Sequence, residues 1–295
     1  MSNKKPQDSA VAKFRALHES GCFVLPNPWD VGSAIYLERA GFKALASTSA
    51  GFAFSRGLSD EGLPLELVLA HLCELAVATS LPVNADFQNG YAYEPEGVVR
   101  NVKRCLATGV AGLSIEDNTG RTEAPLYEKN LAIERMRAAR KTIDDSGTGV
   151  ILTGRCEAWL VDQADPFRFV LDRLVAYAEA GADCLYAPGV KSPDAISEIV
   201  KAVAPKPVNV LVAGFNRELT LAQLTDLGVR RVSVGSALAC AAWGAVSRAV
   251  REIAENGSFE AFADAAPFAE INGIFSTPSG DRKPGPIGRA SQRRI

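Results

Sequence analysis

A chain of 295 residues that is 47% hydrophobic and 22% charged can bury the core of one large α/β domain, which suits its length better than two small domains. Its formal charge of -2 provides no general electrostatic field for nucleic acid or a membrane surface. The polar N-terminus lacks the apolar core of a signal peptide, and no later apolar run approaches the roughly 20 residues that a membrane-spanning helix needs. We therefore expect a cytoplasmic protein with neither nucleic-acid nor membrane partners.

Cysteine and histidine content argues against two kinds of site. The six cysteines are scattered without C-x-x-C spacing, in a chain long enough to fold without disulfide bonds. The two histidines, His18 and His71, fall in helical patterns away from the predicted strand ends. We expect mostly buried thiols, and we do not expect a zinc or iron site built on imidazole ligands.

Short apolar runs alternate with helical patterns along most of the chain. Four runs each follow a glycine placed where a helix would end in the left-handed conformation: Gly41, Gly109, Gly181 and Gly228. Four others begin at Cys22, Leu81, Gly149 and Lys206. Nearly continuous hydrophobicity in such short runs is typical of parallel strands covered by helices. The pattern predicts an α/β fold, namely a (β/α)8 TIM-type barrel.

The connecting segments are predicted from their spacing of apolar residues. A loop rich in serine and glycine follows the second strand and leads to a helix over 65–78. A second helix, over 130–143, carries a basic face that we interpret as solvent-exposed.

Both ends of the chain add to the barrel. An amphipathic helix over 9–20 is expected to close its bottom, and a long helix over 237–254 follows the last strand. We assign 1–254 to the barrel, 255–276 to a C-terminal helical extension and 277–295 to a disordered tail rich in glycine, proline and arginine. The phenylalanines of the extension need a partner surface, either this barrel or a neighbouring subunit.

Two consecutive predicted strands end on carboxylates, Asp86 and Glu116. The carboxyl ends of barrel strands open on one face, where active sites are built, so these side chains should converge. Convergent carboxylate oxygens suit a hard cation such as Mg²⁺. The alternative is that each acid caps the following helix.

Six segments, NPWDVGSA, STSAGFAFSRGLSD, NADFQNGY, SIED, TGRCEA and PVNVLV, occur in order at the predicted strand ends. Together they resemble the isocitrate lyase/phosphoenolpyruvate mutase (phosphonomutase) superfamily over about residues 22–243. The resemblance implies a barrel that binds Mg²⁺ or Mn²⁺ and acts on small 2-oxo or 2-hydroxy carboxylates. It also implies C–C or P–C bond chemistry through an enolate-like intermediate, in a homodimer or homotetramer whose C-terminal helices are swapped between subunits.

The resemblance assigns roles to single residues. Asp86 and Glu116 match the metal-site carboxylates, and Asp60 matches an aspartate that reaches the metal through water. Arg155 matches the arginine that holds the substrate carboxylate. The planar guanidinium group suits this role because it can donate two parallel hydrogen bonds to a carboxylate.

Other positions are matched to the substrate pocket. The backbone of Thr48, Ser49 and Ala50 corresponds to a loop that donates N–H groups to the substrate, and Trp29 to a residue lining the pocket. Asn209 is expected to point inward from strand seven, where it either contacts substrate or satisfies backbone groups in the core.

Departures from the family pattern bear on the chemistry. Gln88 stands where many members have a second carboxylate, so the site loses a charge. The loop 118–129, NTGRTEAPLYEK, lacks the cysteine with which isocitrate and methylisocitrate lyases exchange a proton. Cys105 and Cys156 do not occupy this loop.

The same loop does not match the mutases convincingly, because Asn118 stands where a lysine is usual. We expect it to act as a lid that excludes water. Tyr127 and Arg121 are its candidate acid or anion-holding groups.

The sequence therefore predicts a Mg²⁺-dependent lyase or decarboxylase acting on a small carboxylate. Two alternatives stay open. One is a phosphonomutase or phosphonate hydrolase, and the other is a non-catalytic barrel that binds a carboxylate metabolite. The exact substrate does not follow from the sequence.

Overall fold

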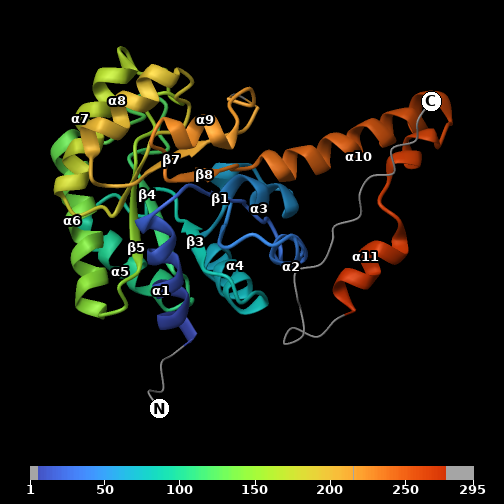
Figure 1. Ribbon diagram of the computed structural model, residues 1–295, viewed down its shortest axis with the longest axis horizontal. Coiled ribbons are helices and arrows are strands. Elements are labelled where there is room, and N and C mark those ends of the chain that lie inside the picture. The colour runs from blue at the N-terminus through green and yellow to red at the C-terminus, as the bar shows by residue number, and fades with distance from the viewer. Residues whose placement is uncertain (1–5, 215, 277–295) are drawn as a thin grey trace.

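The computed structural model describes residues 6–214 and 216–276, and these form a barrel of eight parallel strands surrounded by helices (Figure 1). The strands are β1 (Phe23–Leu25), β2 (Leu45–Ala46), β3 (Val83–Asp86), β4 (Gly112–Glu116), β5 (Ile151–Arg155), β6 (Cys184–Tyr186), β7 (Val208–Leu211) and β8 (Arg231–Ser233). Each was predicted within its apolar run, and the predicted (β/α)8 TIM-type barrel is confirmed.

The strands are hydrogen-bonded in the order β1-β8-β7-β6-β5-β4-β3-β2. The two edges meet where the Ala46 amide donates to the Pro26 carbonyl across 3.0 Å. This bond nearly closes the sheet, so the ends of all the strands face one mouth.

The helices between the strands are α2 (Val31–Arg39), α3 (Ser49–Ser55), the 3-10 turn η1 (Asp60–Gly62), α4 (Leu65–Ala78), α5 (Pro95–Leu106), α6 (Lys129–Ser146), α7 (Pro166–Glu179), α8 (Pro193–Val203) and α9 (Leu221–Asp226). The segment after β2 was expected to be a loop but contains α3. The Thr48 hydroxyl caps this helix by accepting from the Gly51 amide at 3.2 Å.

Glycines end the helices before the even-numbered strands, as predicted. Gly41, Gly109, Gly181 and Gly228 have φ of +86°, +90°, +101° and +85°. Side-chain-bearing residues rarely adopt this conformation, so glycine lets the chain turn sharply into the next strand.

Helix α1 (Pro6–Glu19) closes the bottom of the barrel, as expected for 9–20. Gln7 donates to the carbonyl of Val110, just before β4, and Arg15 donates to that of Gly149, just before β5. Phe14 of the same helix is fully buried in the core. The barrel is therefore sealed at the amino ends of its strands and opens at their carboxyl ends.

Beyond β8 the chain leaves the barrel. Helix α10 (Ala237–Asn256) extends away from it, and after the turn η2 (Glu260–Asp264) helix α11 (Phe268–Phe275) packs against α2 (Figure 1). The extension 255–276 as a separate unit and its exchange between subunits both stay predictions. The predicted disordered tail 277–295 lies outside the described residues.

No helix in the described ranges is both long and apolar enough to cross a membrane.

Candidate active site

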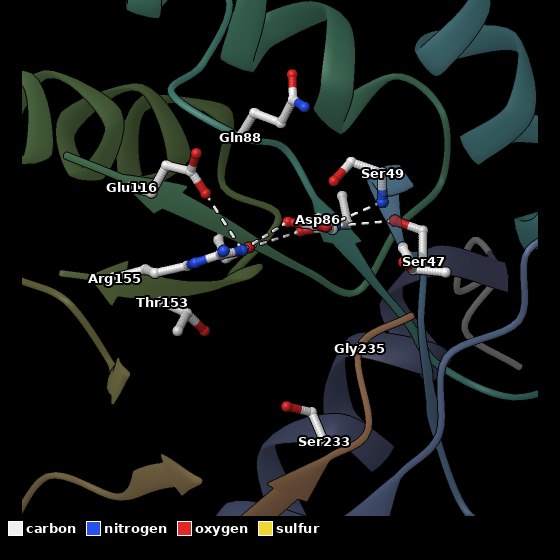
Figure 2. A network of polar contacts seen from close by, with 12 residues as sticks. Ser47, Ser49, Asp86, Gln88, Glu116, Thr153, Arg155, Ser233 and Gly235 are labelled. Carbon is white, nitrogen blue, oxygen red and sulfur yellow. Dashed lines mark hydrogen bonds and ion pairs between the residues drawn. The ribbon is translucent and has the colours of Figure 1, made fainter. Parts of the chain in front are cut away.

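The site at the barrel mouth is centred on Arg155, the last residue of β5. Its Nη1 lies 3.2 Å from Asp86 Oδ1 and 3.2 Å from Glu116 Oε2, and its Nε donates to Glu157 Oε1 across 2.5 Å. Figure 2 shows the guanidinium between Asp86 and Glu116. The predicted convergence of these two acids therefore occurs through an arginine that lies between them.

Strand geometry explains this meeting. Asp86, Glu116 and Arg155 are the last residues of three neighbouring strands, and Glu116 pairs directly with Arg155 in the β4–β5 register. Side chains alternate between the two faces of a strand, so Ser114, two residues before Glu116, also faces inward. Leu113 and Ile115 face the surrounding helices and are buried there. The apolar outer face thus anchors the strand that presents Glu116.

Asp86 is also held from the β2 side. Its Oδ2 accepts from the Ser49 amide at 3.0 Å, and its own amide donates to Ser47 Oγ at 2.8 Å (Figure 2). Thr48, Ser49 and Ala50 border a cavity at the barrel mouth, and their donation of N–H groups to a substrate stays a prediction. The Ser49 amide, expected to hold substrate, is here used to orient Asp86.

Asp60 and Gln88 meet at the edge of the site. Gln88 Nε2 donates to the Asp60 carbonyl at 3.1 Å and lies 3.4 Å from its Oδ1. Gln88 has φ of +43°, an uncommon conformation for a residue other than glycine. The amide that replaces a carboxylate therefore pairs with a neighbouring acid.

The acids outnumber the cation that balances them. Burial raises the pKa of Glu116 well above its usual value although Arg155 lowers it, and burial likewise raises the pKa of Glu157. Burial also raises the pKa of Asp60, with the Asp86 charge adding to the effect. Burial disfavours the charge of Arg155, but Glu116 and Glu157 outweigh it and hold its pKa well above the ordinary value. The site accordingly favours an additional positive charge.

Two cavities open beside Arg155. One, of about 200 Å³, lies over the barrel axis and is bordered by Asp86, Asn209 and Arg231. The other, of about 440 Å³, is bordered by Glu116, Glu157 and the loop residues Asn118, Thr119 and Gly120. Arg155, Ser49, Asp60 and Leu160 border both. One cavity thus holds a second arginine, whereas the other is lined by acids.

Asn209 points inward, as expected, and is 2% exposed. Its Oδ1 accepts from Arg231 Nε at 2.9 Å and its Nδ2 donates to Ser233 Oγ at 2.9 Å. Asn209 therefore forms hydrogen bonds with side chains of β8. From the sequence we had considered hydrogen bonds to backbone groups of the core instead.

Three candidate side chains, one predicted for the pocket and two for the lid loop, lie outside the walls of the two cavities at Arg155. Trp29 borders a separate apolar cavity with Leu238 and Phe275 and is absent from the walls of both cavities at Arg155. Tyr127 is 3% exposed, with Arg135 stacked 4.0 Å from its ring, so it is not a group of the open lid. Arg121 lies over the Tyr93 ring at 5.3 Å and likewise borders neither cavity.

From the sequence we did not identify Glu157, nor Asp117 and Tyr177, which form the hydrogen bonds that support it. The Glu157 amide donates to Asp117 Oδ1 at 2.8 Å, and Asp117 Oδ2 accepts from the Tyr177 hydroxyl at 2.7 Å. The spacing of Arg155 and Glu157 within TGRCEA was an available signal, since residues two apart beyond a strand can face the same side.

Cys105 and Cys156 lie outside the loop 118–129, as predicted, but only three of the six cysteines are buried, and Cys73 and Cys240 are exposed. Cys105 and Cys156 are fully buried, and burial raises the pKa of each. A thiol that stays protonated and inaccessible does not exchange protons with a substrate.

The donor set suits a divalent cation. Asp60, Asp86, Glu116 and Glu157 offer carboxylate oxygens, which Mg²⁺ prefers, and they are incompletely neutralised by Arg155. No group of three or more metal-binding side chains in the described part of the chain is arranged to hold an ion alone. Mg²⁺ usually takes one or two protein carboxylates and completes its shell with water and substrate oxygens.

Fold and site together define a (β/α)8 barrel with an arginine- and carboxylate-lined pocket at the carboxyl ends of its strands. The sequence model of the family described as phosphoenolpyruvate phosphomutase matches residues 14–254. The chain belongs to this family, within the isocitrate lyase/phosphoenolpyruvate mutase superfamily, as its motifs predicted. Members of the superfamily typically depend on Mg²⁺, act on small carboxylates and are usually oligomeric.

Individual relatives include lyases. A solved structure from Burkholderia cenocepacia J2315, provisionally described as a lyase/mutase, is 42% identical with a TM-score of 0.91, and the match covers 95% of this chain and 100% of that one. The oxaloacetate decarboxylase of Rhodopseudomonas palustris (strain BisB5) is 31% identical over 76% of this chain and 75% of its own length. The 2-methylisocitrate lyase of Escherichia coli (strain K12) is 32% identical over 56% of this chain and 55% of its own.

Proposed function

We propose that this protein is a Mg²⁺-dependent carbon–carbon lyase, of the decarboxylase or lyase type, acting on a small 2-oxo or 2-hydroxy carboxylate. The observation that carries the proposal is the position of Arg155, held by Asp86, Glu116 and Glu157 at the open end of the barrel. Family membership supports this reading, since relatives include an oxaloacetate decarboxylase and a 2-methylisocitrate lyase.

Arg155 would bind and orient the substrate carboxylate. Its hydrogen bonds and ion pairs with described residues use Nη1 and Nε, so Nη2 can donate into the cavities that Arg155 borders. The guanidinium plane is fixed by acids on two sides, so little conformational entropy is lost when the substrate binds.

Asp86 and Glu116 would hold the cation, with Asp60 within reach through water. When bound, Mg²⁺ acts as a Lewis acid toward charge developing on the substrate's α-oxygen, an effect worth several kcal/mol. Asp60 borders both cavities, so its carboxylate can accept hydrogen bonds from water or from the substrate in either one. The loop 118–129 would exclude water from the acidic cavity, which it borders through Asn118, Thr119 and Gly120.

Phosphonomutase or phosphonate hydrolase chemistry is the second candidate. The family model that matches this chain is named phosphoenolpyruvate phosphomutase, and the resemblance of the motifs to this superfamily implied P–C bond chemistry as an alternative. The absence of cysteine from the loop 118–129 removes one feature of the isocitrate lyases but does not distinguish the remaining lyases from mutases.

One experiment separates these candidates. The protein with Mg²⁺ is incubated with oxaloacetate, methylisocitrate, phosphonopyruvate or phosphoenolpyruvate, and products are followed by ¹H and ³¹P NMR. We expect cleavage of a C–C bond, lost in Arg155→Lys and retained in Arg168→Lys, a control whose side chain is 86% exposed. Conversion of phosphonates alone would favour the second candidate. No turnover of any carboxylate would contradict the enzyme proposal and favour a barrel that only binds its ligand.

A further inference from the structure

Arg231 is a buried cation whose partners are all neutral. It is 2% exposed, and its guanidinium contacts Asn209 Oδ1 at 2.9 Å, Thr153 Oγ1 at 3.0 Å and His18 Nε2 at 3.4 Å. Burial, with the Arg231 charge adding to it, lowers the pKa of His18 to about 3, so this imidazole is uncharged at neutral pH. No aspartate or glutamate among the described residues forms an ion pair with Arg231.

An arginine in this position leaves a charge to be balanced. Arginine stays protonated in proteins, and a buried charge is costly unless an opposite charge lies beside it. Neutral hydrogen-bond acceptors compensate only part of this cost. A negatively charged ligand would complete the environment of Arg231.

The cavity over the barrel axis gives a ligand access to it. Arg231 borders this cavity together with Asp86 and Arg155. Asn84 borders it as well and is 4% exposed, yet its Oδ1 has no partner among the described residues. A ligand hydroxyl or a water bound with the ligand would supply the missing donor.

The two arginines lie at different depths. Arg231 contacts Thr153, which precedes Arg155 by two residues on β5. Because a parallel strand rises by about 3.3 Å per residue and barrel strands tilt by about 36°, Thr153 lies roughly 5 Å deeper along the barrel axis than Arg155. One short molecule with an anionic group at each end could therefore reach both guanidinium groups.

We propose that the inner end of this cavity is a subsite for a second carboxylate of the substrate, with Arg231 as its counter-ion. This inference rests on the proposed function and narrows it, because the substrate is then a short dicarboxylate. Arg155 and the metal-site acids hold the 2-oxo or 2-hydroxy end, and Arg231 selects for charge at the other end. Arg231 is thus a specificity residue and takes no part in bond cleavage.

The test compares two ligands that share one end. Binding of 3,3-difluorooxaloacetate and of pyruvate, both with Mg²⁺, is measured by calorimetry on wild type, Arg231→Gln and Arg231→Lys. We expect Arg231→Gln to weaken the dicarboxylate about 10- to 100-fold, the range for a lost charge-assisted hydrogen bond, and to change pyruvate binding by less than about 3-fold. Arg231→Lys, which keeps the charge, should lose less. Equal weakening of both ligands would overturn the subsite.

A second measurement needs no variant. Succinate and butyrate have chains of the same length, and the shift in melting temperature that each causes is measured on the wild-type protein. A larger shift with succinate is expected, and equal shifts would also overturn the subsite, even if Arg231→Gln fails to fold. If neither difluorooxaloacetate nor pyruvate binds wild type, the proposed binding of a 2-oxo carboxylate at Arg155 is contradicted, a result distinct from binding of both without discrimination.

Discussion

Glu157 Oε1 accepts a hydrogen bond from Arg155 Nε across 2.5 Å at the carboxyl end of β5. Glu157 is itself fixed from behind, since its amide donates to Asp117 at 2.8 Å. The position of the arginine is therefore set by a chain of contacts that runs from the pocket into the wall between the strands and helices.

We predict that Glu157→Gln impairs carboxylate binding with the fold retained. The amide keeps the size of the side chain but loses the charge that holds the guanidinium plane, and a charge-assisted bond contributes about 1.5–3 kcal/mol. We expect kcat/KM to fall roughly 10- to 100-fold, with a rise in KM, measured by steady-state kinetics. Glu179→Gln, at an exposed position of α7, serves as the control. Unchanged kinetics in Glu157→Gln would show that Arg155 needs no such support.

Asp86→Ala should abolish binding of Mg²⁺ and Mn²⁺. Asp86 supplies a metal-site charge that Gln88 does not share, and its loss leaves Glu116 paired with Arg155. Calorimetric titration of the metal into wild type and variant measures this. Asp145→Ala, whose side chain is 60% exposed on α6, should titrate like wild type. Identical titrations of Asp86→Ala and wild type would remove the metal assignment.

Isocitrate and methylisocitrate should be turned over at trace levels at most. The loop 118–129 contains no thiol, and Cys105 and Cys156 are buried. Product formation is followed by coupled assay or NMR with wild type, Cys105→Ser and Cys156→Ser. Efficient cleavage that disappears in either folded variant would mean that a thiol reaches the substrate after all.

Truncation after Ala254 should disrupt assembly. The side chains of Trp243, Phe259, Phe262 and Phe268 are 50%, 64%, 54% and 83% exposed in the single chain. Apolar surface left in water costs about 25 cal/mol per Å², so we expect exchange or packing of these helices in a dimer or tetramer. Light scattering of the full chain and the truncated chain is the measurement. A well-folded monomer at micromolar concentration, equally stable without residues 255–295, would contradict this expectation.

His18 should make the protein less stable in mild acid. Its pKa is lowered to about 3 in the folded state from 6.5, so its contribution is fully present above pH 6.5 and is lost as the pH falls toward 3. Between pH 6.5 and pH 5 this amounts to at most about 2 kcal/mol. Thermal melts at pH 7 and pH 5 should therefore differ less in His18→Gln than in wild type. The same pH dependence in both proteins would show that His18 is not the group responsible.

The sequence by itself determined the order of the barrel and the place of its mouth. Glycines with positive φ, such as Gly109 and Gly181, and short apolar runs are local signals, because they reflect the conformation of a few adjacent residues. The acids Asp86 and Glu116 could be placed together because parallel strands of a barrel end on one face. For the same reason the family motifs at those ends could be identified without coordinates.

Only the tertiary structure decided which polar groups meet inside. The helix over 130–143 was expected to carry a solvated basic face, and Arg137 and Lys141 are exposed, but Arg135 is 1% exposed and donates to backbone carbonyls of the loop after β3. Arg231 lies inside the barrel against Asn209 and Thr153, residues 22 and 78 positions away. Such contacts depend on closure of the sheet and on the stagger of its strands, which set the depth of each side chain. The periodicity of apolar residues predicts neither the closure of the sheet nor the stagger of its strands. It shows which face of one helix or strand is apolar, but not which element packs against that face.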